Sequence, residues 1–464
     1  MNIAEPLVTN PYLEQNYKPV QEEVTALNLK VIGQIPADLE GNFLRIGPNP
    51  VFVPDVAKYH IFDGDGMIHG VHLRNGKADY RNRFVDSEGL REEREKGDWI
   101  YPGLNMFGEM IARGEMPSGA KNTGNTAMVV HKGQLFALME GSTPYAISLP
   151  ELKTLGEHDF DGTLTHNFTA HPKVDVKTGE MVTFGYSPLP PYLNYSVIDT
   201  HGKVVHHKEI SIPKGIMMHD CAITESYTIF PDLPLVFDFE AAARGEGMIQ
   251  WDADNGCRFG IVPRFGSDEN IKWFDIPESF LFHISNAWEE GDEVVVQACR
   301  SNRGGIELTE GVEPTEQMGQ LYEWRLNMAT GEIKTRAIDT VNYCDFPRIN
   351  DNLMGFKNRY LYASRFVVDG MGTFNAELKY DNDSGEIEVH EFGEHHFSSE
   401  AIFAPRTNAV DEDDGYVICF VYDELSESSE CHIIDAKRFS EPAVARIKIP
   451  QRVPHGFHAA WAPG

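Results

Sequence analysis

The sequence predicts an all-β protein, and the all-β architecture that fits it best is a β-propeller. Helical periodicity is scarce, whereas short β-rich runs bounded by Gly, Asp and Asn recur from end to end. One hairpin pattern also repeats along the 464 residues without a boundary of changed composition. A pair of β-sandwiches would contain similar hairpins, so the turns alone do not choose between the two architectures.

The predicted strands and hairpins are evenly distributed. Clear strands are expected at residues 134–139, 293–297, 360–363 and 416–421. A strand, a tight turn built on Asp or Asn and a positive-φ Gly, and a returning strand are expected at VDVKTGEM (174–181), IDTHGKV (198–204), LNMATGEI (326–333) and YDNDSGEI (380–387). In a propeller such hairpins form the blades around a central axis.

One segment, residues 90–119, interrupts the β pattern. Its first part, REEREK, is charged and helical in character, and its second part is rich in Met and Phe with few β-branched residues. We expect either a lid over one face of the propeller or a simple surface excursion. Exposed Met, Leu and Phe side chains in a lid would suit the entry of an apolar substrate or contact with a membrane.

Composition limits the possible partners and the compartment. The formal net charge of −31 leaves no basic surface to release counterions from a polyanion, which argues against nucleic-acid binding. Six isolated cysteines without a C-x-x-C motif fit a reducing compartment. The polar N-terminus lacks the features of a signal peptide, and no apolar run is long enough to span a bilayer. We expect a cytoplasmic protein, free or bound peripherally to a membrane.

Four dispersed histidines stand in short apolar frames: His171 in FTAHP, His219 in IMMHD, His283 in LFHI and His458 in GFHA. Inner strands of successive propeller blades face one axis, so these residues could converge there on one metal ion. Neutral imidazole suits Zn, Cu, Fe and Ni. A shell of imidazoles alone leaves the charge of the ion uncompensated, so carboxylates on the outer ring nitrogens are expected. Each histidine taken alone is more often a core residue than a metal ligand.

Seven sequence blocks in fixed order resemble one known family over nearly the whole chain. The blocks are GNFLRIGPNP (41–50), FDGDGMIHG (62–70), FTAHPKVD (168–175), MMHDCAITE (217–225), FHISNAWEE (282–290), EDDGYV (412–417) and RVPHGFH (452–458). Together they resemble the carotenoid cleavage oxygenase family. The resemblance implies a seven-bladed β-propeller capped by a mostly helical dome, as one domain over residues 1–464 with about 90–119 in the dome.

The resemblance also implies the metal and its ligands. Fe(II) would lie on the propeller axis, held by His171, His219, His283 and His458. Three carboxylates would orient three of these rings: Glu140 for His219, Asp345 for His283 and Glu400 for His458. The family has Glu where this chain has Asp345, and the shorter side chain requires a longer contact or a shifted backbone. The chain is acidic enough for all three to be ordinary turn residues.

Two nearby histidines are expected not to bind the metal. His455 precedes His458 by three residues and takes the place of an aromatic residue in the family, and Ala459 takes the place of a glycine. His166 lies close to His171 in the sequence. Both are expected to make ordinary hydrogen bonds, as histidine commonly does.

The implied activity is a dioxygenase reaction: O2 cleaves a conjugated C=C bond of a carotenoid or apocarotenoid into two carbonyl products, with no catalytic residue beyond the metal centre. Stilbene-cleaving members bind a phenol through a lysine just before the first glutamate, where this chain has Met139. This apolar residue favours a carotenoid or apocarotenoid substrate, and a stilbene dioxygenase is kept as the alternative within the family. The alternative from another class is a calcium-binding propeller hydrolase or scaffold, whose site would use oxygen ligands. No protein partner is implied.

Overall fold

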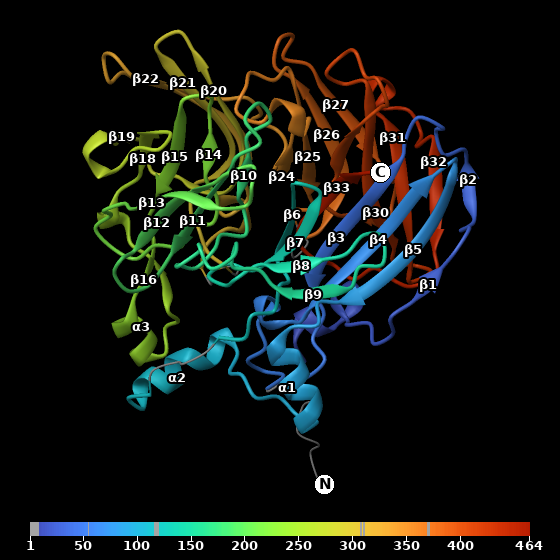
Figure 1. Ribbon diagram of the computed structural model, residues 1–464, viewed down its shortest axis with the longest axis horizontal. Helices are drawn as coiled ribbons and strands as arrows, with labels where there is room; N and C mark the ends of the chain where they lie inside the picture. Colours follow the sequence, from blue (N-terminus) through green and yellow to red (C-terminus); the bar gives the residue numbers. More distant parts are fainter. Residues whose placement is uncertain (1–8, 54, 116–119, 307–308, 310, 369–371) are drawn as a thin grey trace.

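The strands of the computed structural model stand around a central axis, and short helices gather on one side of the ring (Figure 1). The structure describes residues 9–53, 55–115, 120–306, 309, 311–368 and 372–464. Within these residues the sheets form seven blades, each an antiparallel set of strands. The predicted all-β propeller is confirmed, and the pair of β-sandwiches is excluded.

Each blade extends from an inner strand beside the axis to an outer strand. Blade 1 contains β33 (Ala459–Pro463), β3 (Gly41–Pro48), β4 (Gly66–Arg74), β5 (Lys77–Phe84) and β1 (Thr25–Ala26). Blade 2 contains β6 (Ala127–His131), β7 (Gln134–Leu138), β8 (Tyr145–Ile147) and β9 (Thr154–Glu157). Blade 3 contains β10 (Lys173–Val174), β11 (Met181–Tyr186), β12 (Leu193–Ile198) and β13 (Val204–Glu209). Blade 4 contains β14 (Ala222–Ile223), β15 (Tyr227–Asp232), β18 (Arg258–Pro263) and β19 (Lys272–Asp275), with the inserted pair β16 (Leu235–Phe237) and β17 (Ile249–Trp251).

The remaining blades continue around the ring. Blade 5 contains β20 (Phe280–Glu290), β21 (Glu293–Ser301), β22 (Gln320–Asn327) and β23 (Ile333–Ala337). Blade 6 contains β24 (Cys344–Arg348), β25 (Tyr360–Phe366), β26 (Phe374–Asp381) and β27 (Ile387–Glu391). Blade 7 contains β29 (Ile402–Pro405), β30 (Gly415–Asp423), β31 (Ser428–Asp435), β32 (Ala445–Ile449) and β2 (Val31–Gly33). The short β28 (His396–Ser398) pairs with both β26 and β30 and joins the last two blades.

Strands from the two ends of the chain close the ring. The C-terminal β33 pairs with β3, with Phe43 opposite Trp461, and β2 adds an N-terminal strand to the edge of blade 7. Two blades are therefore built from segments that lie more than 400 residues apart in the sequence. The pairing of β33 with β3 covers the inner edge of blade 1, which would otherwise be open to association with another strand.

All four predicted hairpins are present with the expected register. Val174 pairs with Met181, Ile198 with Val204, Leu326 with Ile333 and Tyr380 with Ile387. Each turn contains a glycine at positive φ: Gly179, Gly202, Gly331 and Gly385, with φ between 72° and 81°. Glycine suits these positions because it carries no Cβ to clash in the left-handed region.

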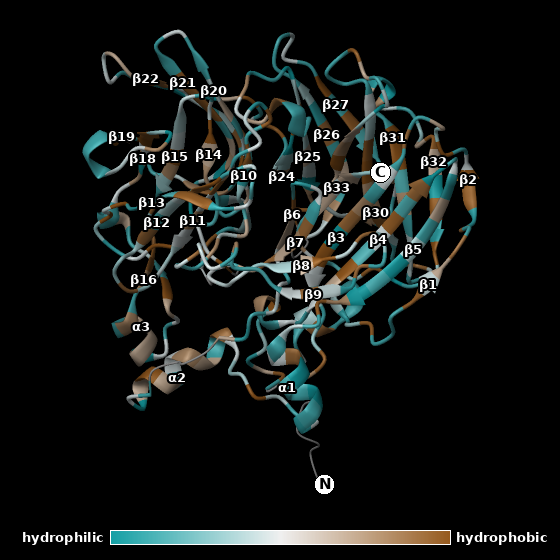
Figure 2. Ribbon diagram, viewed as in Figure 1, coloured by the Kyte–Doolittle hydropathy of each residue, from teal (hydrophilic) through white to brown (hydrophobic). Residues whose placement is uncertain are grey.

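The hydrophobic core is divided among the gaps between neighbouring blades. Val182 and Tyr195 of blade 3, for example, pack with Phe230 and Val262 of blade 4. Tyr362 of blade 6 packs with residues of blade 7 in the same way. Strands buried on both faces are accordingly hydrophobic over continuous runs, as in β30 from Val417 to Val421, which is brown in Figure 2. The sheets are thus held as packed layers around the axis.

The predicted interruption of the β pattern contains helices on one side of the ring (Figure 1). Helix α1 (Glu88–Lys96) begins after Ser87, whose side chain accepts a hydrogen bond from the Leu90 amide, and ends at Gly97 with φ 76°. Helix α2 (Phe107–Ala112) contacts α3 (Phe239–Arg244), which lies between β16 and β17. Residues 116–119 of the predicted segment lie outside the described part of the chain. Among the described residues, no helix is long and apolar enough to cross a membrane.

Candidate metal centre

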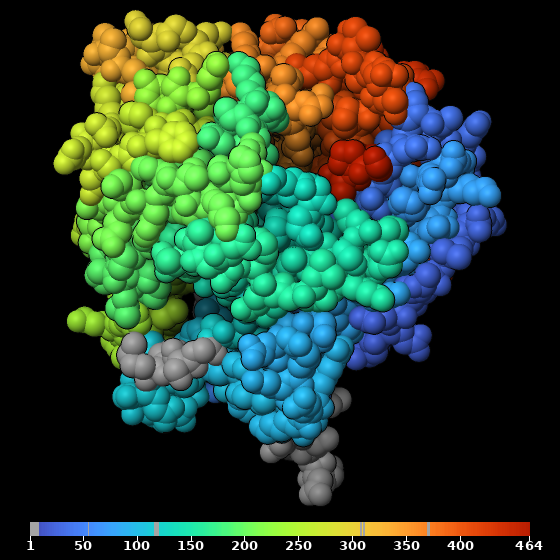
Figure 3. Space-filling view, in the orientation of Figure 1, coloured from blue at the N-terminus to red at the C-terminus, as the bar shows by residue number. Residues whose placement is uncertain are grey.

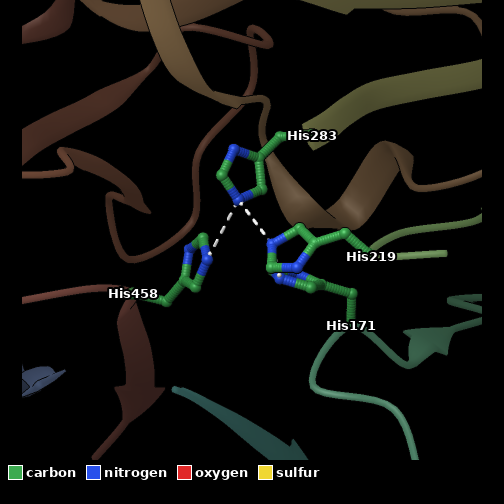
Figure 4. A group of neighbouring side chains, drawn as sticks. All are labelled: His171, His219, His283 and His458. Carbon is green, nitrogen blue, oxygen red and sulfur yellow. Dashed lines mark hydrogen bonds between the residues drawn. The ribbon is translucent and has the colours of Figure 1, made fainter. Parts of the chain in front are cut away.

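Each of the four histidines lies in or beside the inner strand of a different blade. His171 precedes β10, His219 precedes β14, His283 lies within β20, and His458 directly precedes β33. Inner strands of successive blades contact one another, including β14 with β20 and β29 with β33. The rings therefore meet near the axis although 287 residues separate His171 from His458 (Figure 4).

The ring nitrogens converge on one small volume. The Nε2 atom of His219 lies 2.9 Å from that of His171 and 3.1 Å from that of His283. The Nε2 atom of His458 lies 3.1 Å from that of His283. The ligating atoms of all four rings lie within 4.8 Å of one another, and this is the only such group of His, Cys, Asp or Glu among the described residues.

Three of the rings contact a carboxylate on the side opposite the cluster. Glu140 pairs with Nδ1 of His219. The Oδ1 atom of Asp345 lies 2.8 Å from Nδ1 of His283, and Oε1 of Glu400 lies 3.2 Å from Nδ1 of His458. His171 forms no ion pair with a carboxylate in the part of the chain that the structure describes. The sequence-predicted acids are thus brought to the rings to which they were assigned.

Burial favours the neutral form of two of these rings, His171 and His458. Burial, together with the neighbouring rings, lowers the pKa of His171 well below its usual range. Burial lowers the pKa of His458 to about 4, although Glu400 acts in the opposite direction. At His283 burial is outweighed by the Asp345 carboxylate, which raises the pKa. The neutral imidazoles of His171 and His458 are the form that binds metals.

The chemistry of this donor set fits a bound cation. Because a carboxylate only accepts hydrogen bonds, His283 and His458 donate their Nδ1–H groups to Asp345 and Glu400 and keep a lone pair on Nε2. These two lone pairs face each other across 3.1 Å and cannot hydrogen-bond together. Two nitrogens bound at right angles about 2.1 Å from a metal would lie about 3.0 Å apart, which matches the spacing of neighbouring rings.

The local charge also fits a cation. Among the described residues, three carboxylates contact the rings, Glu140, Asp345 and Glu400, and one of them, Glu400, is also paired with Arg348. Anionic groups directly behind the rings are what a bound cation would balance.

A further layer of contacts orients the carboxylates, and it was not predicted from the sequence. The hydroxyl of Tyr186 donates to Glu140. Arg348 places Nε 3.4 Å from Glu400 and donates from Nη2 to the Ala459 carbonyl at 2.7 Å. Burial raises the pKa of Glu400, but Arg348 and His458 lower it more, to about 2. Arg348 lies in the segment DFPRIN that also contains Asp345, so an arginine three residues after the acid was the available signal.

A cavity of about 360 Å³ extends from the histidines toward the helices. His219, His283 and His458 form part of its wall, and the rest is mainly apolar: Phe62, Leu104, Phe107, Met217, Phe282 and Phe457. Leu104 and Phe107 come from the segment predicted as a lid, which therefore contributes to the wall. The helical segments pack below the propeller with a recess at their junction (Figure 3). Such a cavity suits an elongated apolar ligand.

The two histidines expected to be bystanders lie outside the cluster. His166 contacts the Ser196 hydroxyl at 2.7 Å and the Asn167 carbonyl at 2.6 Å. The ring of His455 packs 4.7 Å from that of Tyr17. Neither belongs to the group of converging nitrogens in the described residues.

Known proteins resemble the chain from end to end. The Retinal pigment epithelial membrane protein family matches residues 17–463. A carotenoid 9,10(9',10')-cleavage dioxygenase from Crocus sativus is 41% identical over 485 residues, which cover 97% of this chain and 88% of that protein. The lignostilbene dioxygenase of Pseudomonas brassicacearum superposes with a TM-score of 0.89 at 30% identity, covering 99% of this chain and 100% of the other. Cobalt-substituted Synechocystis ACO superposes with a TM-score of 0.85 at 28% identity, covering 97% and 98%.

These matches extend over nearly the full length of both partners and include the blades that carry the four histidines. The resemblance predicted from the seven sequence blocks is therefore confirmed. The chain belongs to the family of the retinal pigment epithelial membrane protein and the carotenoid cleavage oxygenases.

Proposed function

We propose that this protein is a non-haem Fe(II) dioxygenase that cleaves a conjugated C=C bond of a carotenoid or apocarotenoid with O2, giving two carbonyl products. His171, His219, His283 and His458 would bind the iron, and Glu140, Asp345 and Glu400 would orient three of these rings. One observation carries the proposal: four imidazole rings converge, and three of them form part of the wall of a mainly apolar cavity.

The donor set supports iron over calcium. Calcium takes carboxylate and carbonyl oxygens, whereas the converging atoms here are imidazole nitrogens. Imidazole suits iron, and the cobalt-substituted form of the Synechocystis relative supports an exchangeable transition metal at the corresponding place. The calcium-dependent hydrolase is therefore the weaker alternative.

Bound ferrous iron would supply the binding and activation of O2. The residues of this chain would hold the substrate in position and keep water away from it. Phe62, Phe282 and Phe457 would hold the polyene beside the histidines, and burial of its hydrocarbon surface favours binding by roughly 25 cal/mol per Å². The apolar wall would also exclude water from the reacting bond. No general acid or base is required.

Met139 supports a polyene over a phenolic stilbene as substrate. It lines the cavity, and its sulfur accepts a hydrogen bond from the Thr123 hydroxyl at 3.3 Å. A methionine offers no charge to a phenol, and its flexible side chain packs well against hydrocarbon. The Crocus sativus relative supports the 9,10 double bond as the scissile one. The likeness to lignostilbene dioxygenase keeps stilbene cleavage as the second candidate.

We also propose how the helices serve the reaction. Residues of about 90–119 would be part of a dome integral to a single domain over residues 1–464, because Tyr101, Leu104 and Phe107 of this segment line the same cavity as three of the histidines. Leu104 and Phe107 would lead an apolar substrate inward from a membrane surface, to which the cytoplasmic protein would bind peripherally. Sedimentation with lipid vesicles tests this contact, and recovery of all protein in the supernatant would contradict it.

The central experiment combines metal analysis with product identification. We expect one iron per chain and, from a panel of carotenoids, apocarotenals and hydroxystilbenes, carbonyl products from the polyenes with oxygen derived from O2. Mass spectrometry of the products locates the cleaved bond. Calcium without iron would refute the oxygenase, and turnover restricted to hydroxystilbenes would select the second candidate.

A further inference from the structure

Among the described residues no carboxylate pairs with His171, yet a largely buried ion pair lies close to it in the chain. The Nζ atom of Lys173, two residues after His171, lies 2.7 Å from Oδ1 of Asp220, the residue that follows His219. The Lys173 side chain is 11% exposed and the Asp220 side chain 3%. The ion pair therefore joins the segment that carries His171 to the segment that carries His219.

Asp220 also reaches a third histidine segment. Its Oδ2 atom accepts a hydrogen bond from the backbone N–H of Ile284 at 2.8 Å, and Ile284 directly follows His283. Its Oδ1 atom accepts one from the backbone N–H of Cys221 at 2.7 Å. One buried carboxylate thus connects residues within two positions of His171, His219 and His283, which come from blades 3, 4 and 5.

We propose that Lys173 and Asp220 are positioning residues for the metal site, and that their ion pair holds His171 in place of the carboxylate that this ring lacks. The inference rests on the proposed metal-binding role of the histidines. It assigns the pair no contact with metal or substrate. Its effect passes through the backbone, because Lys173 is anchored at the start of β10 and fixes the segment from which His171 projects.

The chain offers a matched control for this ion pair. Lys379 and Asp413 form a comparably buried pair, with 4% and 10% exposed side chains and a distance of 3.0 Å. Neither lines the cavity that contains the histidines. Replacing one partner leaves a buried charge uncompensated in both pairs, so both should lose thermal stability. Only the pair beside the histidines should change the metal site.

The test compares Lys173→Met, Lys173→Arg and Lys379→Met. Iron affinity is measured by competition with a chelator, the geometry of the site by the visible spectrum after Co(II) substitution, and stability by thermal unfolding of the metal-free protein. We expect Lys173→Met to lower iron affinity roughly 10 to 100-fold and to shift the cobalt spectrum. Lys173→Arg should largely restore both, and Lys379→Met should lower only the unfolding temperature.

Unchanged iron affinity and an unchanged cobalt spectrum in Lys173→Met would overturn the proposal, as would equal metal losses in Lys379→Met. If Lys173→Met does not fold, the double variant Lys173→Met/Asp220→Asn removes both buried charges and is compared by the same measurements; wild-type metal properties in it would also overturn the proposal. Absence of iron and cobalt binding in the wild-type protein would instead refute the proposed function.

Discussion

Asp345 lies 2.8 Å from the Nδ1 atom of His283, closer than the 3.2 Å between Glu400 and His458, although its side chain is one methylene shorter. A local change in the backbone brings the shorter Asp345 side chain close enough to His283. The β24–β25 register shifts between Asp345 and Arg348, and Phe346 has a φ of 53°. The irregular strand also stacks the Phe346 ring on His283, with centroids 5.1 Å apart. The short acid is thus part of a locally altered strand.

Replacing Asp345 by Asn should lower iron affinity and activity roughly 10 to 100-fold, because the amide removes the negative charge that faces His283. Replacing it by Glu keeps the negative charge and should reduce iron affinity and activity less, since the longer side chain can bend to reach His283. Chelator competition and turnover of a polyene measure both effects. Equal losses in the two variants would show that side-chain length matters more than charge.

His283→Ala should remove bound iron and turnover while leaving the propeller folded, because the blades are held by packing between sheets. Circular dichroism, metal analysis and product formation measure the three properties. His166→Ala is the matched control, since His166 lies near blade 3 but outside the cluster. Full turnover by His283→Ala, or loss of iron from His166→Ala, would contradict the assignment of ligands.

Arg348→Met should lower turnover by a factor similar to that of Glu400→Gln, roughly 10 to 100-fold. Arg348 lies 3.4 Å from Glu400 and binds the carbonyl of Ala459, so its loss should loosen both the acid and the strand after His458. If the two residues act as one unit, the double variant should be little worse than either single variant. Fully additive losses would indicate separate roles.

Met139→Lys should reduce cleavage of an unsubstituted polyene, because it places a further ammonium group in a mainly apolar wall. The same change offers a hydrogen-bond donor and a positive charge to a phenol. Rates are compared on a carotenoid and on a hydroxystilbene, and Met139→Leu serves as the control of similar volume. A carotenoid rate unchanged by the lysine would place the substrate away from this position.

Glu430 gives a test of pH-dependent stability away from the metal site. Hydrogen bonds from His432, aided by Lys448, lower its pKa to about 2, below the usual value of 4.5. Its stabilising effect should be fully present above about pH 4.5 and be lost as the pH falls through about 2. Urea unfolding should show Glu430→Gln less stable by about 1 kcal/mol at neutral pH, after allowance for solvent screening. A difference that persists undiminished at about pH 2 would contradict this origin.

Sequence reasoning worked where local pattern decides structure. The hairpin at residues 326–333 was predicted because Asn327 and Gly331 suit its turn, and the structure confirms its register. The histidines were found because a polar ring in an apolar frame is conspicuous. Glu140, Asp345 and Glu400 were selected only through the family resemblance, since nothing local distinguishes them among 71 acidic residues.

The contacts between chain segments could not be predicted in this way. Lys173 and Asp220 both stand inside recognised sequence blocks, yet only the fold shows that they pair across 47 residues. Tyr186 likewise meets Glu140 because β11 runs beside the end of blade 2. Such partners depend on how neighbouring blades pack, which periodicity along one strand does not encode.

Closure of the ring by β33 determines when the metal site can be completed during folding. His458 directly precedes this strand, so the fourth imidazole reaches the others only after the two ends of the chain have met. Long-range pairing of this kind is slow compared with hairpin formation. A cation cannot therefore template early folding through all four rings. The cation would instead bind after the propeller has closed, and its bonds to the four rings would slow reopening of the closed ring.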